Sequence, residues 1–147
     1  APDECVKLAQ YAGSIGCDAV VVTPPYFYKP DGAMVERFLE TIIETSGVPV
    51  ILYNIPLFTS PLDYDVVKRL SRYDSVVGMK DSSGSMVDFM HFMDNDCTPP
   101  LPAVSHMYLH SIIHNLGSRD INRPITRVTN IGTGSFADEL TAPIRVT

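Results

Sequence analysis

The sequence is poor in positive charge and in cysteine, and each shortage excludes a class of protein. Only 11 lysines and arginines stand against 17 aspartates and glutamates, which gives a formal net charge of −6. Such a chain lacks the basic surface that binds nucleic-acid phosphates, so we expect no nucleic-acid partner. The three cysteines, Cys5, Cys17 and Cys97, are odd in number and form no CxxC pair. They favour reduced thiols in the cytoplasm over a disulfide framework or a zinc ribbon.

Long apolar runs are also absent. The longest, such as Ala19–Val22, fall far short of the ~20 residues that span a bilayer, and no basic and apolar leader opens the chain. We therefore expect no membrane partner. The chain is also short: 147 residues fit one domain, whereas a complete eight-stranded (β/α) barrel typically needs about 250. A whole barrel is excluded, although 45% apolar residues can form a sizeable core.

From residue 1 to about residue 95, the sequence contains a repeating βα pattern. Apolar runs without alternation, typical of strands covered on both faces, occupy 18–23, 48–53 and 75–79. A segment with apolar residues at helical spacing precedes each run, and a fourth follows Ser85. The strands begin about 27 to 29 residues apart, the size of one βα unit. We predict an α/β fold with a parallel sheet of about three βα units.

Residues 96–147 have a different composition. They contain no lysine but four arginines, three of the four histidines and five of the twelve prolines, and no clean βα period continues through them. We therefore divide the chain into a partial barrel domain over 1–95 and an unassigned, atypical tail over 96–147. Within the tail, the pattern indicates a short helix over Val104–Leu116 and a strand over Arg127–Ile131.

The tail also contains a candidate metal site. His106, His110 and His114 are spaced by four, so a helix would place them on one face, where two histidines can share a metal ion. No HExxH pattern accompanies them, and the nearest acid is Asp120. Chance enrichment in histidine is the simpler interpretation, and we expect no bound metal.

The residues best suited to catalysis end two consecutive strands. Tyr53 ends one strand and Lys80 follows the next. Functional groups of parallel α/β folds gather at the carboxyl ends of the strands, and adjacent strands lie about 4.8 Å apart, so both side chains can enter one site. A partly desolvated lysine favours the neutral amine that attacks carbonyls, and a phenol can carry the protons. The alternative is structural, with Lys80 in a salt bridge to Asp81 and Tyr53 as a core aromatic.

Three motifs surround these residues, in this order along the chain: GCDAVVVTPPY over 16–26, VILYNIP over 50–56 and VGMKDSSG over 77–84. Together they resemble the dihydrodipicolinate synthase / N-acetylneuraminate lyase family of Schiff-base aldolases, which are (β/α)8 barrels acting on pyruvate and other 2-keto acids. The matched motifs correspond to the family's fourth, fifth and sixth βα units. The resemblance thus implies a partial (β/α)8 TIM barrel, a small-molecule 2-keto acid substrate, no cofactor, and a homo-oligomer, which is a tetramer in the family.

The resemblance also assigns roles to residues. It places the Schiff-base lysine at Lys80 and the proton-shuttling tyrosine at Tyr53, and it matches Tyr26 to a tyrosine lent to a neighbouring subunit's proton relay. Phe58 stands where the synthase branch usually has an arginine that holds a substrate carboxylate. Because a phenyl ring cannot hold an anion, Phe58 favours the lyase or sugar-acid aldolase branches of the family over the synthase branch.

The serines after Lys80 have two interpretations. Ser82 and Ser83 could bind a polyhydroxy substrate, as the resemblance suggests. Alternatively, Ser83 and Ser85 are ordinary turn and helix-capping residues.

The chain departs from the family in two places. The family's Gly-Thr-Thr-Gly-Glu type motif is absent, and residues 96–147 do not match the seventh and eighth units. Two hypotheses follow. Either the chain is a Schiff-base lyase or aldolase for 2-keto acids, or it is a catalytically inactive barrel fragment that acts only as a folding or oligomerisation module.

Overall fold

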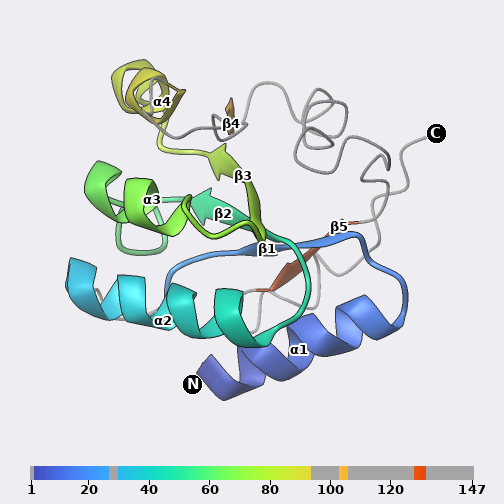
Figure 1. Ribbon diagram of the computed structural model, residues 1–147. Coiled ribbons are helices and arrows are strands. Elements are labelled where there is room, and N and C mark those ends of the chain that lie inside the picture. Colours follow the sequence, from blue (N-terminus) through green and yellow to red (C-terminus); the bar gives the residue numbers. More distant parts are fainter. Residues whose placement is uncertain (1, 27–29, 94–102, 106–127, 132–147) are drawn as a thin grey trace.

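A computed structural model describes residues 2–26, 30–93, 103–105 and 128–131. The helices within these ranges are α1 (Pro2–Ser14), α2 (Gly32–Thr45), α3 (Tyr64–Leu70) and α4 (Met86–Met93). The strands are β1 (Ala19–Val22), β2 (Val50–Asn54), β3 (Val76–Asp81), β4 (Ala103–Ser105) and β5 (Val128–Ile131). All pair in parallel in one sheet with the order β4-β3-β2-β1-β5 (Figure 1).

The helix ends follow from local chemistry. Asp31 caps α2, because its carboxylate accepts a hydrogen bond from the Met34 N–H at 2.8 Å. Gly16 and Gly47 follow the ends of α1 and α2, and both adopt the positive φ that other residues avoid, 84° and 68°. Each glycine turns the chain from a helix into the following strand.

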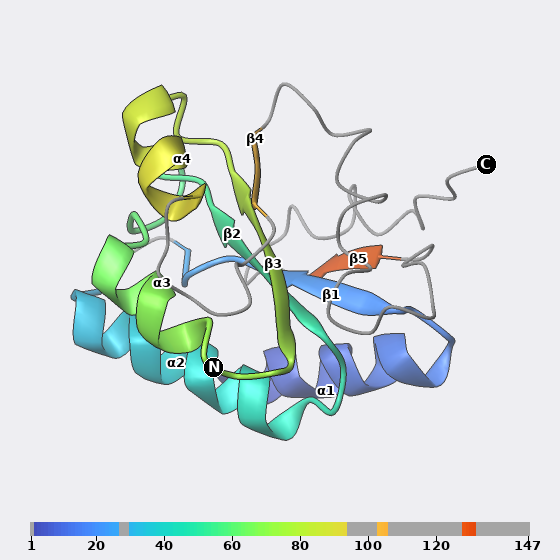
Figure 2. The ribbon, with the colours of Figure 1, turned by 45° about the horizontal axis from the view of Figure 1, so that its top comes forward.

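The helices cover one face of the sheet. Figures 1 and 2 show α1, α2 and α3 side by side beneath the strands, and α3 also contacts α4. Alternate residues of β1 and β2 point toward these helices, as do Val76 and Met79 of β3, between which the register with β2 shifts. They join the buried side chains of the helices in one core: Val20, Val22, Val50, Leu52, Val76 and Met79. The intervening strand residues, among them Tyr53 and Lys80, therefore face the opposite side. The predicted α/β fold with parallel βα units is confirmed.

The βα period extends further than the sequence indicated. The first four strands begin at Ala19, Val50, Val76 and Ala103, and β4 pairs in parallel with β3 through Lys80↔Val104 and Asp81↔Ser105. The expectation that the period ends near residue 95 is therefore wrong by one strand. β4 has three residues and prolines at 99, 100 and 102 just before it, so it is too short to produce a recognisable pattern.

The tail also contributes the other edge of the sheet. The strand predicted at Arg127–Ile131 is confirmed as β5, which pairs in parallel with β1. The helix predicted over Val104–Leu116 is wrong at its first residues, because Val104 and Ser105 belong to β4. There, backbone pairing with β3 outweighs the helical spacing of the side chains. The rest of that helix lies outside the described residues.

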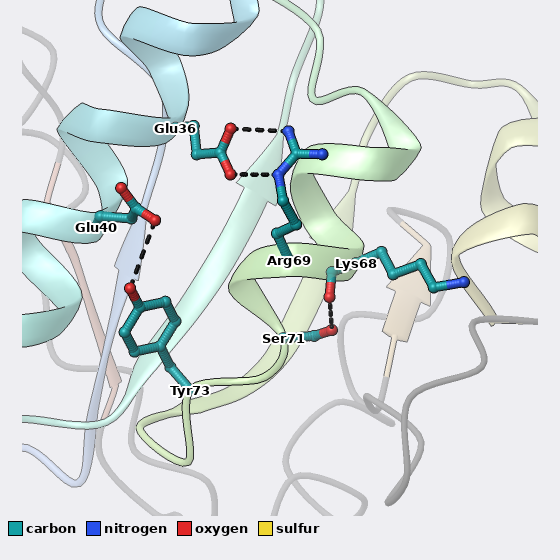
Figure 3. Close-up of polar contacts among 6 residues, drawn as sticks. All are labelled: Glu36, Glu40, Lys68, Arg69, Ser71 and Tyr73. Atoms are coloured by element: carbon teal, nitrogen blue, oxygen red, sulfur yellow. Dashed lines mark hydrogen bonds and ion pairs between the residues drawn. The ribbon is translucent and has the colours of Figure 1, made fainter.

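Polar contacts fasten α2 to α3 and to the turn after it (Figure 3). Two guanidinium nitrogens of Arg69 on α3 donate to the two carboxylate oxygens of Glu36 on α2, one of them at 2.8 Å. The hydroxyl of Tyr73 lies 3.4 Å from a carboxylate oxygen of Glu40. These contacts lie at the helix layer, on the opposite side of the sheet from Tyr53 and Lys80.

Candidate active site

Tyr53 and Lys80 meet at the carboxyl end of the sheet, as the sequence predicts. They are register partners in β2 and β3, and the Lys80 Nζ lies 4.1 Å from the centroid of the Tyr53 ring. Tyr53 is 8% exposed, whereas Lys80 is only half-buried. A cation over a ring face is a favourable contact, so it holds the end of Lys80 beside β2. The end of Lys80 thus lies beside the Tyr53 ring, on a side chain that solvent partly reaches.

The structural alternative for Lys80, a salt bridge with Asp81, does not occur. Strand alternation directs Asp81 to the opposite face from Lys80, and its carboxylate accepts hydrogen bonds from Asn54 and Ser83 instead. Among the residues with described side chains, no ion pair joins Lys80 to an acid.

The two candidate serines have different surroundings. The Ser82 hydroxyl donates to the Tyr53 hydroxyl at 3.4 Å, a long contact that places it beside the tyrosine oxygen. The Ser83 hydroxyl donates to Asp81 at 2.7 Å and accepts from the Ser85 N–H at 3.1 Å. Ser85 in turn caps α4 by accepting from the Asp88 N–H. Ser82 therefore belongs with Tyr53 and Lys80, whereas the Ser83 hydroxyl is engaged within the turn.

Tyr26 and Phe58 form an aromatic pair in the loops that follow β1 and β2. Their rings stack with centroids 5.9 Å apart and planes inclined by 13°. An antiparallel bridge between Tyr26 and Thr59 holds the two loops together. Phe58 is 50% exposed, so the pair presents aromatic surface to solvent. The structure thus brings Tyr26 and Phe58 to each other.

The sequence analysis did not identify two features at the carboxyl ends of the strands. Thr23, directly after β1, is 5% exposed, and its hydroxyl has no hydrogen-bond partner among the described residues. Asn54 and Asp81, one position beyond Tyr53 and Lys80, are buried and hydrogen-bonded to each other at 2.7 Å. The Asn54–Asp81 pair could have been predicted, because polar residues that directly follow two buried runs at matching positions are expected to meet.

Two further predictions concern metal and membrane. The described side chains contain no group of three or more histidines, cysteines or acids able to hold a metal ion. The candidate ligands His106, His110 and His114 lie outside the described residues. No helix in the described part of the chain is long and apolar enough to cross a bilayer.

Known proteins resemble this chain in sequence and in fold. The sequence model of the dihydrodipicolinate synthetase family matches residues 1–100. The chain is 28% identical over 130 residues to 4-hydroxy-tetrahydrodipicolinate synthase of Methanothrix thermoacetophila, covering 79% of the chain and 44% of that enzyme. It is 34% identical over 92 residues to 2-dehydro-3-deoxy-D-gluconate/2-dehydro-3-deoxy-phosphogluconate aldolase of Picrophilus torridus, covering 62% of the chain and 35% of that enzyme.

Solved structures show the same relationship. The 2-keto 3-deoxygluconate aldolase of Picrophilus torridus superposes with a TM-score of 0.68 at 25% identity, over 90% of this chain and 45% of the aldolase. YagE of E. coli K12, solved in complex with pyruvate, gives a TM-score of 0.68 at 27% identity, over 79% of this chain and 41% of YagE. The chain thus spans less than half the length of these relatives, and its fold is part of their barrel. It belongs to the dihydrodipicolinate synthetase family.

Proposed function

We propose that this chain is a lyase or aldolase that acts on pyruvate or a related 2-keto sugar acid through a Schiff base on Lys80. The observation that carries the proposal is the pairing of Tyr53 and Lys80, with an amine 4.1 Å from the centre of a phenol ring at the carboxyl end of a parallel sheet. Membership of a family whose similar members include synthases and aldolases supports the same reaction class.

The chemistry follows from the two side chains. The unprotonated Lys80 amine adds to the keto carbon, and the resulting carbinolamine loses water to form an iminium ion. The iminium withdraws electrons from the adjacent carbon, so a bond from that carbon to an aldehyde can break or form. Each step moves a proton, and the Tyr53 hydroxyl is the donor and acceptor that we assign to these transfers. Ser82 lies within reach of that hydroxyl and orients it.

The surroundings favour a polyhydroxy substrate over a dicarboxylate. Phe58 offers an apolar face where a guanidinium would hold an anion, and Ser82 offers a hydroxyl near the reacting amine. We therefore assign the chain to the sugar-acid side of the family. The resemblance to an aldolase of 2-dehydro-3-deoxy-D-gluconate supports this assignment.

Tyr26 completes the proposal. We assign it to the subunit interface of a homo-oligomer, where its hydroxyl would serve a neighbouring subunit's proton relay. Its stacking on the half-exposed Phe58 supports a surface position. Replacing Tyr26 by alanine should shift the oligomer toward monomer in light scattering, and an unchanged mass would contradict this role.

A cleavage assay tests the function. The chain is incubated with 2-keto-3-deoxygluconate, and released pyruvate is measured with lactate dehydrogenase and NADH. We expect pyruvate release by the wild type and none by Lys80→Met, a control that keeps the length of the side chain without an amine. Equal background rates for both proteins would contradict the proposed activity, and would favour the folding or oligomerisation role instead.

A further inference from the structure

The last residues of β2 and β3 form a hydrogen-bonded pair behind the proposed catalytic pair. Asn54 and Asp81 are register partners one position beyond Tyr53 and Lys80, and they are 3% and 2% exposed. Their side chains project from the opposite face of the sheet because strand residues alternate. They therefore do not contact a ligand of Lys80, and any effect on it must act through the neighbouring residues.

One hydrogen bond joins the two side chains, and others join the pair to both loops of the site. The Asn54 amide nitrogen donates to Asp81 at 2.7 Å, and the Asn54 side-chain oxygen accepts from the Leu62 N–H at 3.0 Å. The Asn54 backbone oxygen accepts from the Ser82 N–H at 2.8 Å, and the second Asp81 oxygen accepts from the Ser83 hydroxyl at 2.7 Å. One pair thus fixes the loop that carries Phe58 and the turn that carries Ser82.

The direction of the central hydrogen bond is fixed by charge. Asp81 is a buried carboxylate, and burying a charge is costly unless donors satisfy it. Asn54 and Ser83 supply those donors. At position 54 an amide both donates to Asp81 and accepts from Leu62, whereas a carboxylate there would face a second carboxylate across 2.7 Å.

We propose that Asn54 and Asp81 are positioning residues, which set the Lys80 amine against Tyr53 and Ser82 by holding the ends of β2 and β3 in register. This inference rests on the proposed Schiff-base function. The reason is geometric. Asn54 directly follows Tyr53 in the chain, and Asp81 directly follows Lys80. A change in the distance between the ends of β2 and β3 therefore moves Lys80 relative to Tyr53. Displacements of about 1 Å at a reacting centre can slow a reaction roughly 100-fold.

A swap of the two side chains tests the proposal. Asn54→Asp places two carboxylates together, whereas N54D/D81N restores one amide and one carboxylate with the hydrogen bond reversed. In the double variant the Leu62 N–H and Ser83 hydroxyl both keep an acceptor. Asp81→Asn alone is the milder change, because the Ser83 hydroxyl can reverse and accept.

The readout is the rate at which borohydride traps pyruvate on Lys80 of the full chain, measured against pyruvate concentration and divided by the folded fraction from circular dichroism. We expect the maximal rate to fall roughly 10- to 100-fold in N54D, with little change in the half-saturating concentration, and to recover most of the way in N54D/D81N.

Each other outcome has a distinct meaning. A maximal rate per folded chain that is equal in N54D and wild type would overturn the positioning role and leave the proposed function standing. A double variant as slow as N54D would also overturn it. A wild-type chain that traps no pyruvate would overturn the proposed function, and this inference with it.

Discussion

Tyr53 and Lys80 are paired across β2 and β3, and the Lys80 nitrogen lies 4.1 Å from the centre of the Tyr53 ring. The ring and the hydroxyl of Tyr53 have separate tasks in our account. The ring face holds Lys80, and the hydroxyl moves protons.

Tyr53→Phe separates these tasks. The variant keeps the ring under Lys80 and removes the proton carrier, so we expect pyruvate trapping on Lys80 to slow by about 100-fold or more with the fold unchanged. Ser82→Ala is the matched control, since it removes only the 3.4 Å contact to the Tyr53 hydroxyl and should slow trapping far less. Equal rates for Tyr53→Phe and wild type would exclude Tyr53 as the proton carrier.

Phe58→Arg tests how this position sets specificity. A guanidinium near the site would bind the substrate carboxylate, so we expect the half-saturating pyruvate concentration to fall roughly three- to tenfold. Phe58→Leu controls for the loss of stacking on Tyr26, because it removes the ring without adding charge. If the arginine and leucine variants bind pyruvate alike, Phe58 does not face the substrate carboxylate.

Thr23→Val should make the chain more stable. The buried Thr23 hydroxyl has no partner among the described residues, and an unsatisfied buried hydroxyl is destabilising. Valine has the same shape, so urea unfolding should show a gain of about 1 kcal/mol.

Thr59→Val is the opposite control for that measurement. The Thr59 hydroxyl is equally buried, but it donates to the backbone oxygens of Ile55 and Ser60 at 3.2 Å. Its loss should lower the free energy of unfolding by about 1 kcal/mol. A destabilised Thr23→Val variant would mean that the Thr23 hydroxyl has a partner in solution.

The ion pair between α2 and α3 predicts a pH dependence of stability. Hydrogen bonds from Arg69 lower the pKa of Glu36 below its ordinary 4.5 (Figure 3). A carboxyl whose pKa is lower in the folded state stabilises the fold above its unfolded pKa and loses this effect as pH falls through the folded pKa. Glu36→Gln should therefore melt slightly below wild type at pH 7, and the two melting temperatures should converge as the pH falls below 4.5.

Salt provides the check on that interpretation. The pair is partly exposed, so 1 M NaCl should narrow the difference between wild type and Glu36→Gln at pH 7. If the melting temperatures of wild type and Glu36→Gln still differ at low pH and high salt, Glu36 stabilises the fold through packing rather than through its charge.

Much of the site was predictable because it lies in strands with a regular period. Buried β-branched runs of similar length place Tyr53 and Lys80 at equivalent positions, and parallel pairing then brings them together. The helix stops at Gly16 and Gly47 were predictable for a similar reason, since a positive φ is a local property of glycine.

The remainder depends on contacts between distant segments. β4 has only three residues, and β5 pairs with β1 although more than a hundred positions separate them in the chain. Neither pairing therefore produces a local pattern in the sequence. That the Thr23 hydroxyl has no partner among the described residues depends on how neighbouring elements cover it.

The central claim is that Lys80 forms a Schiff base with a 2-keto acid. To test it directly, the full chain is incubated with pyruvate and sodium borohydride and then digested. Tandem mass spectrometry locates the residue that carries the reduced pyruvyl mass. We predict the added mass on Lys80 and on none of the other three lysines, Lys7, Lys29 and Lys68. Of these, Lys7 and Lys68 lie on the helices α1 and α3. An unmodified Lys80, or equal modification of all four lysines, would contradict the proposed Schiff base.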